Sequence, residues 1–146
     1  MDEFERDLAG NMTAIDVARA SLVQRVRQLS DDDLGRTRRG GWSVREVLRH
    51  VIESEISYTK VLAFLRGAPI DIAAAGPDDV ATASGAVGAL ERYRAVLLTA
   101  LQGVDEATFY EMRSLGHEQY SVISVLENIA SHDHEHLEQI EKTAPS

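Results

Sequence analysis

The chain has 146 residues, of which 44% are hydrophobic and 27% are charged, a composition typical of one globular domain over residues 1–146. Its formal net charge of −9 repels a phosphate backbone, so we expect no nucleic-acid partner. The absence of cysteine excludes disulfides, iron–sulfur clusters, thiolate zinc sites and cysteine nucleophiles. Because no run of about 18 apolar residues and no apolar signal core occurs, we expect a cytoplasmic protein without a membrane partner.

Apolar residues at spacings of three and four predict a first amphipathic helix over about residues 2–29. They are Phe4, Leu8, Met12, Ile15, Leu22, Val26 and Leu29. Residues 30–41 are rich in Asp, Arg and Gly and indicate a loop. Arg36, Arg38 and Arg39 form a small basic patch there, either as a solvated loop or as a contact for a phosphate or carboxylate.

A second helix begins at Ser43, which with Glu46 forms a capping-box motif. The helix is expected to end near residue 66, because Gly67-Ala68-Pro69 follows. Its apolar stripe consists of Val44, Val47, Leu48, Val51, Ile52, Tyr58, Leu62 and Leu65.

A third helix is predicted within residues 80–101, on the stripe Leu90, Tyr93, Leu97, Leu98 and Leu101. Residues 104–120 have no sustained period and are expected to hold a short helical turn at 105–110 and then a loop. Ser121 caps a fourth helix that extends to about residue 142. Its stripe consists of Val122, Val125, Leu126, Ile129, Leu137 and Ile140.

The four stripes together predict an all-α protein, a four-helix bundle of the antiparallel type with longer second and third connections. No segment alternates between apolar and polar residues as a half-buried strand does, so no sheet is expected.

Three of the five histidines lie close together in the fourth helix. At about 100° per residue, His132 and His136 fall in line with Ile129 and Ile140, whereas His134 falls on the opposite, solvent-facing side. Two histidines at positions i and i+4 on one face can bind one metal ion together.

The second helix offers a third imidazole, because His50 lies at the edge of its apolar stripe. If both helices face the bundle interior, His50, His132 and His136 converge across one interface. The alternative is a set of hydrogen-bonded core histidines. An all-imidazole site suits zinc or nickel, whereas magnesium and calcium prefer oxygen ligands.

Two carboxylates interrupt the apolar stripes, Glu55 in the second helix and Asp133 in the fourth. A buried carboxylate costs several kcal/mol unless it is paired or hydrogen-bonded. Each residue therefore either pairs with an Arg, a Tyr or a capping amide, or accepts the ring N–H of a metal-bound histidine.

Two blocks of sequence resemble a known family. The block from Gly40 to His50, followed by Glu55, resembles the Trp-Ser signature of the DinB/YfiT-like superfamily, and residues 130–140 resemble its last helix, with His-x3-His followed by Gln-Ile. The resemblance implies a four-helix bundle that holds a divalent metal through His50, His132 and His136. It also implies frequent homodimers, and relatives with known activity transfer low-molecular-weight thiols such as mycothiol or bacillithiol.

The sequence therefore leaves several functions open. The first is a metal-dependent enzyme that transfers a low-molecular-weight thiol to an electrophilic small molecule, since an open metal site can deliver a thiolate. The same site could activate water, as in a metal-dependent hydrolase. The remaining hypothesis is a metal-binding stress or binding protein without turnover.

Overall fold

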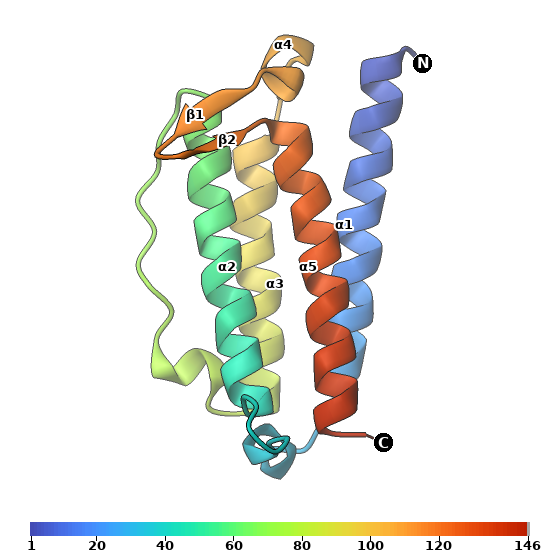
Figure 1. Ribbon diagram of the computed structural model, residues 1–146, viewed down its shortest axis with the longest axis vertical. Coiled ribbons are helices and arrows are strands. Elements are labelled where there is room, and N and C mark those ends of the chain that lie inside the picture. The colour runs from blue at the N-terminus through green and yellow to red at the C-terminus, as the bar shows by residue number, and fades with distance from the viewer. Residues whose placement is uncertain (146) are drawn as a thin grey trace.

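The computed structural model describes residues 1–145 and shows four long helices packed side by side as a bundle (Figure 1). The long helices are α1 (Glu3–Arg27), α2 (Val44–Leu65), α3 (Ala83–Leu101) and α5 (Val122–Thr143). The shorter elements are η1 (Asp32–Gly35), η2 (Pro77–Val80), α4 (Glu106–Tyr110), β1 (Arg113–Leu115) and β2 (Glu118–Tyr120). The predicted four-helix bundle is confirmed, and none of the described helices combines the length and apolar character needed to cross a membrane.

Each long helix begins at a side chain that accepts a hydrogen bond from a backbone amide of the first turn. The capping residues are Asp2, Ser43, Thr82 and Ser121. The predicted starts at Ser43 and Ser121 are therefore confirmed. The Ser43 cap matters for the site, because it fixes the first turn of α2, and His50 lies in the next turn.

The helices do not alternate in direction, which corrects the expectation of an antiparallel bundle. Side chains of α2 reach α3 in parallel register: Arg45 Nε donates to the Val80 carbonyl at one end, and Arg66 Nη1 donates to the Ala100 carbonyl at the other. The reason is the connection over residues 66–82, which runs back along the outside of the bundle before α3 begins (Figure 1). Long crossover connections of this kind allow parallel neighbours in helix bundles.

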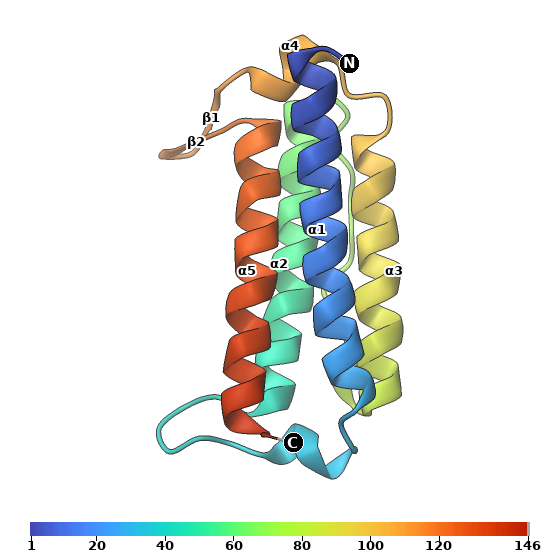
Figure 2. The ribbon, with the colours of Figure 1, turned by 90° about the vertical axis from the view of Figure 1, so that its right-hand side faces the viewer.

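The other two long helices, α1 and α5, are also neighbours, side by side in Figure 1, and both views show that they run in the same direction (Figure 2). Arg19 of α1 pairs with Asp133, and the Arg25 guanidinium donates to the Ala144 carbonyl just beyond α5. In contrast, α2 and α5 run in opposite directions. The start of α2 therefore lies beside the end of α5.

The third connection contains α4, which confirms the predicted helical turn, and a small hairpin that was not predicted. β1 and β2 pair antiparallel, with Arg113 opposite Tyr120, and Gly116 in the two-residue turn has a φ of +66°. Glycine at the first turn position is typical of type II′ hairpins. The prediction of no sheet is wrong here because strands of three residues are too short to show alternation.

The core fills the space between the four long helices. Its largest fully buried apolar side chains come from every one of them and from η1 and α4: Ile15, Leu22, Leu34, Leu48, Ile52, Leu62, Leu90, Leu97, Phe109, Leu126, Ile129 and Ile140. This apolar burial, at about 25 cal/mol per Å², supplies most of the stability of such a bundle.

Candidate metal centre

The three predicted ligands lie together between α2 and α5. The Nε2 atom of His132 is 3.1 Å from Nε2 of His50 and 2.9 Å from Nε2 of His136. Ligand nitrogens of all three residues lie within 4.8 Å of one another, and the three side chains are half-buried. The spacing of one helical turn on α5 and the antiparallel packing of α2 produce this cluster.

Hydrogen bonds alone do not explain this convergence. A ring nitrogen carries either one hydrogen or one lone pair in the ring plane, so His132 Nε2 cannot satisfy two neighbouring nitrogens at once. A shared cation satisfies three lone pairs together. Ions that bind imidazole at about 2.0–2.1 Å accommodate nitrogen pairs about 3 Å apart, so the donor set fits a divalent transition metal.

Gln139 fixes the orientation of one ligand. Its side-chain Oε1 lies 2.8 Å from Nδ1 of His136. An amide oxygen only accepts hydrogen bonds, so Nδ1 carries the hydrogen, and Nε2 of the neutral ring keeps the lone pair that a metal needs. No role of Gln139 was predicted from the sequence, although its position three residues after His136, on the same helix face, was an available signal.

The surroundings favour the neutral form of two of the three histidines. Burial, followed by the charges of His136 and His50, lowers the pKa of His132 to about 4. Burial and then His136 also lower the pKa of His50 below its ordinary value. Neutral imidazole is the form that binds metal, so both pKa shifts favour metal binding.

Aromatic rings frame the cluster, and it opens to solvent on one side. The Trp42 ring meets His50 edge to face at 5.1 Å, and the Tyr58 ring meets His132 at 5.9 Å between centroids. A shallow hollow of about 370 Å³ lies beside the cluster, and its lining residues are His50, Glu53, Ser54, Ser57 and Tyr58. A small molecule can therefore approach the histidines.

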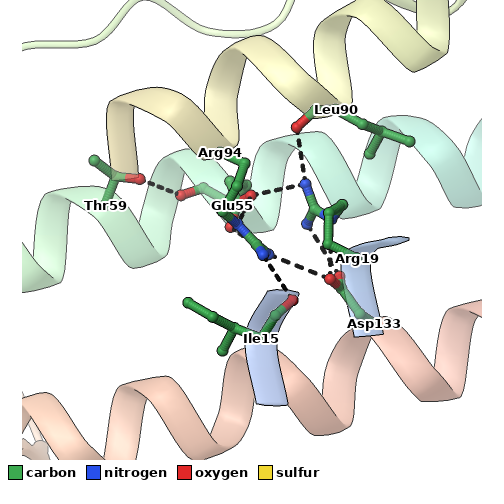
Figure 3. A network of polar contacts seen from close by, with 7 residues as sticks. All are labelled: Ile15, Arg19, Glu55, Thr59, Leu90, Arg94 and Asp133. Carbon is green, nitrogen blue, oxygen red and sulfur yellow. Dashed lines mark hydrogen bonds and ion pairs between the residues drawn. The ribbon is translucent and has the colours of Figure 1, made fainter. Parts of the chain in front are cut away.

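Glu55 and Asp133 lie in the core next to the cluster, where both bind arginines (Figure 3). Arg19 contacts Glu55 at 2.8 Å and Asp133 at 2.9 Å. Arg94 contacts Glu55 at 2.8 Å and Asp133 at 3.2 Å. Within residues 1–145 neither carboxylate has a hydrogen bond to an imidazole, so the structure favours the ion-paired alternative over a direct contact with a metal ligand.

This four-residue ion network takes one side chain from each long helix, and all four side chains are buried. The guanidiniums also donate to backbone carbonyls, Arg19 to Leu90 and Arg94 to Ile15. Burial by itself would lower the pKa of Arg19, but the charges and hydrogen bonds of Glu55 and Asp133 raise it. The network thereby fixes the rotation of α5, with Asp133 turned to the core and the histidines turned to α2.

Neither arginine of the network was predicted from the sequence. The signal was present, because Arg19 lies four residues after Ile15, and Arg94 lies four residues after Leu90. Both interrupt apolar stripes in the way that Glu55 does.

The two remaining histidines lie outside the cluster. His134 is exposed on the outer face of α5, and His117 is exposed in the hairpin turn. Among residues 1–145, the group that could hold a metal ion therefore consists of the three expected histidines.

A four-helix bundle with three converging histidines is the arrangement that the family resemblance implies, and a comparison with family models supports it. The model of the DinB superfamily matches residues 14–140, a range that includes all three histidines. The chain belongs to the DinB superfamily. No curated protein and no solved structure matches it significantly.

Proposed function

We propose that the protein is a metal-dependent transferase that joins a low-molecular-weight thiol, of the mycothiol or bacillithiol kind, to an electrophilic small molecule. The observation that carries this proposal is the convergence of three imidazole nitrogens beside an open hollow. Three protein ligands leave positions for other molecules, as in catalytic metal sites, whereas structural sites are closed.

In this proposal His50, His132 and His136 hold zinc or nickel, and the bound metal lowers the pKa of a thiol cosubstrate. The thiol gives its proton to solvent, its sulfur forms a bond to the electrophilic carbon, and the leaving group departs with its electron pair and takes up a proton. Because the chain has no cysteine, the sulfur must come from a cosubstrate.

The side chains around the cluster have supporting roles. Gln139 keeps the Nε2 lone pair of His136 directed toward the other two ligands. Tyr58 lines the hollow, and burial followed by the charge of Asp133 raises the pKa of its hydroxyl. Tyr58 therefore stays protonated at neutral pH and can donate a hydrogen bond to a bound molecule.

The test begins with metal analysis of the purified protein and continues with a conjugation screen. Zinc- and nickel-loaded protein is mixed with mycothiol or bacillithiol and a panel of electrophiles, and product is measured by mass spectrometry. The matched variants are His132→Ala, which removes a ligand, and His134→Ala, which removes an exposed histidine from the same helix. We expect a conjugate with the wild type and His134→Ala, and none with His132→Ala.

Other results separate the alternatives. Hydrolysis of a substrate without thiol would replace the transferase proposal with a metal-dependent hydrolase. If the protein bound a stoichiometric amount of metal but formed no product with any electrophile of the screen, a metal-binding protein without turnover would be favoured. If the protein bound no metal, the transferase, the hydrolase and the metal-binding protein would all lose their support.

The expected homodimer belongs to the proposal as well, and light scattering after size-exclusion chromatography tests it.

A further inference from the structure

The loop that connects α1 to α2 forms a second hollow that the proposed function does not use. Arg38, Arg39, Gly40, Gly41 and Trp42 line it together with Gln139 and Thr143 of α5, and its volume is about 170 Å³. The loop lies beside the end of α5 because α2 and α5 are antiparallel (Figure 2).

This hollow adjoins the histidine cluster through two of its lining residues. Gln139 is hydrogen-bonded to His136 at 2.8 Å, and the Trp42 ring lies 5.1 Å from the His50 ring. A small molecule in the hollow therefore contacts side chains that themselves touch two of the three candidate ligands.

The loop is also tied to the start of α2. The Val44 amide donates to the Arg36 carbonyl at 3.0 Å, and Thr37 pairs with Ser43 in an isolated β-bridge. Both contacts lie at the base of the loop, so they place residues 38–42 next to the first turns of α2.

The charge of the hollow is opposite to that of the molecule. The chain carries a net charge of −9, yet the charged residues that line the hollow are Arg38 and Arg39. Arg36 pairs with Asp33 at 3.0 Å, whereas within residues 1–145 no acidic side chain lies within ion-pair distance of Arg38 or Arg39. Two exposed guanidiniums beside a candidate metal centre present a local positive potential to an incoming anion.

We propose that this hollow is a subsite for the carboxylate of a small molecule whose reactive group lies at the histidine cluster, an inference that rests on the proposed function. The planar guanidinium fork matches the two oxygens of a carboxylate. The small volume admits one such group, and the acidic surface repels a monoanion less than a dianionic phosphate. The indole of Trp42 supplies an apolar wall for the carbon chain next to the carboxylate.

The experiment uses Trp42 as its reporter, because it is the only tryptophan in the chain and it lines the hollow. Zinc-loaded protein is titrated with 3-mercaptopropionate and with 2-mercaptoethanol, a neutral thiol of similar length, and tryptophan fluorescence is recorded. We expect the carboxylate thiol to bind about tenfold more tightly than the neutral thiol. The double variant Arg38→Ala/Arg39→Ala should lose this preference, and Arg38→Lys/Arg39→Lys should keep part of it.

Arg36→Ala is the matched control, because it removes a positive charge from the same loop but from a residue outside the hollow. It should keep the full preference. Equal binding of the two thiols by the wild type would overturn the proposal, and so would a preference that survives in the double alanine variant.

A second arm separates this proposal from the proposed function. Metal-free protein is titrated with propionate, which carries the carboxylate but no thiol, and zinc stoichiometry is measured separately. If zinc does not bind, the proposed function fails, while the propionate titration and its loss in the double variant still decide the subsite. Inorganic phosphate that competes more strongly than propionate would overturn the assignment to a carboxylate.

Discussion

At the scale of single residues, His132 occupies the central position of the cluster, since its Nε2 lies within about 3 Å of both other ligand nitrogens. Replacing His50, His132 or His136 by Ala should abolish stoichiometric binding of zinc, because two imidazoles hold the ion much less tightly than three. Metal content after dialysis checks this, with helical circular dichroism to show that the bundle persists. His134→Ala and His117→Ala are the matched controls, and loss of metal in either would place the site elsewhere.

Gln139 gives a second prediction at this scale. Gln139→Leu removes the acceptor of the His136 Nδ1–H, so the ring is free to adopt the other tautomer and other orientations. Outer hydrogen-bond partners of this kind change metal affinity by about 10–100-fold, and we expect a loss in that range with unchanged stoichiometry at saturation. Competition with a chromophoric chelator measures it. Glu138→Leu, at the exposed neighbouring position, should leave the affinity unchanged.

The pKa of His132 predicts how stability depends on pH in the metal-free protein. Its value in the folded state is about 4, against 6.5 for the ordinary residue. Between these values the unfolded chain binds the proton and the folded protein does not, so stability is complete above about pH 6.5 and falls as the pH drops toward 4. Thermal melts across this window should show the decrease. The loss of stability over this pH range should be smaller in the His132→Ala variant. An equal loss in the variant and the wild type would contradict the low pKa of His132.

At the scale of elements, the ion network connects all four long helices through buried charges. Arg94→Ala leaves Glu55 and Asp133 with one guanidinium for two carboxylates, and breaking a buried pair in this way costs about 3–5 kcal/mol. Urea unfolding should show this loss, while zinc stoichiometry is retained because Arg19 still pairs with Glu55 and Asp133 and keeps Asp133 turned to the core. The exposed pair of Lys142 and Glu138 provides the contrast, since solvent screens it and Glu138→Gln should leave the urea midpoint unchanged.

The helices and strands also show which parts of the fold were predictable from the sequence. The helices were predictable because each carries a long apolar stripe, and Ser43 and Ser121 begin two of them. The hairpin was not predictable, because three-residue strands carry no periodic signal, although Gly116 marks its turn. The parallel packing of α2 and α3 was missed because periodicity gives helices but not their directions. The sign of parallel packing in the sequence was the length of the connection over residues 66–82, which is long enough to run back along the bundle.

The candidate site was predictable to a similar extent. His132 and His136 share a helix face by spacing alone, and His50 lies at the edge of another stripe. The partners of Glu55 and Asp133 were missed because a charged residue in an amphipathic helix is usually solvated, and only the fold shows that Arg19 and Arg94 point inward. Likewise, the hollow that Arg38 and Arg39 line together with Gln139 depends on how α5 ends beside the loop.

At the scale of the whole molecule, the acidic surface makes a prediction about partners. With a net charge of −9 the protein should show no shift of duplex DNA at about 0.15 M salt, because non-specific binding depends on neutralising phosphates. An electrophoretic mobility assay with zinc-loaded protein checks this. Binding of DNA that weakens steeply as the salt concentration rises would contradict this prediction. It would show that the local positive charge of Arg38 and Arg39 affects DNA binding more than the net charge of the protein does.

The placement of the cluster on α2 and α5 has a consequence for assembly. His50 and His132 are 82 positions apart in the chain, and two of the three ligands belong to the last helix. During synthesis His50 emerges well before α5, so a metal ion held by all three histidines would bind only after α5 has docked. Such an ion would act as a removable cross-link between the two helices, and it would add about 4 kcal/mol when free metal exceeds its dissociation constant about a thousandfold. Metal uptake would then require that the four-helix bundle has closed.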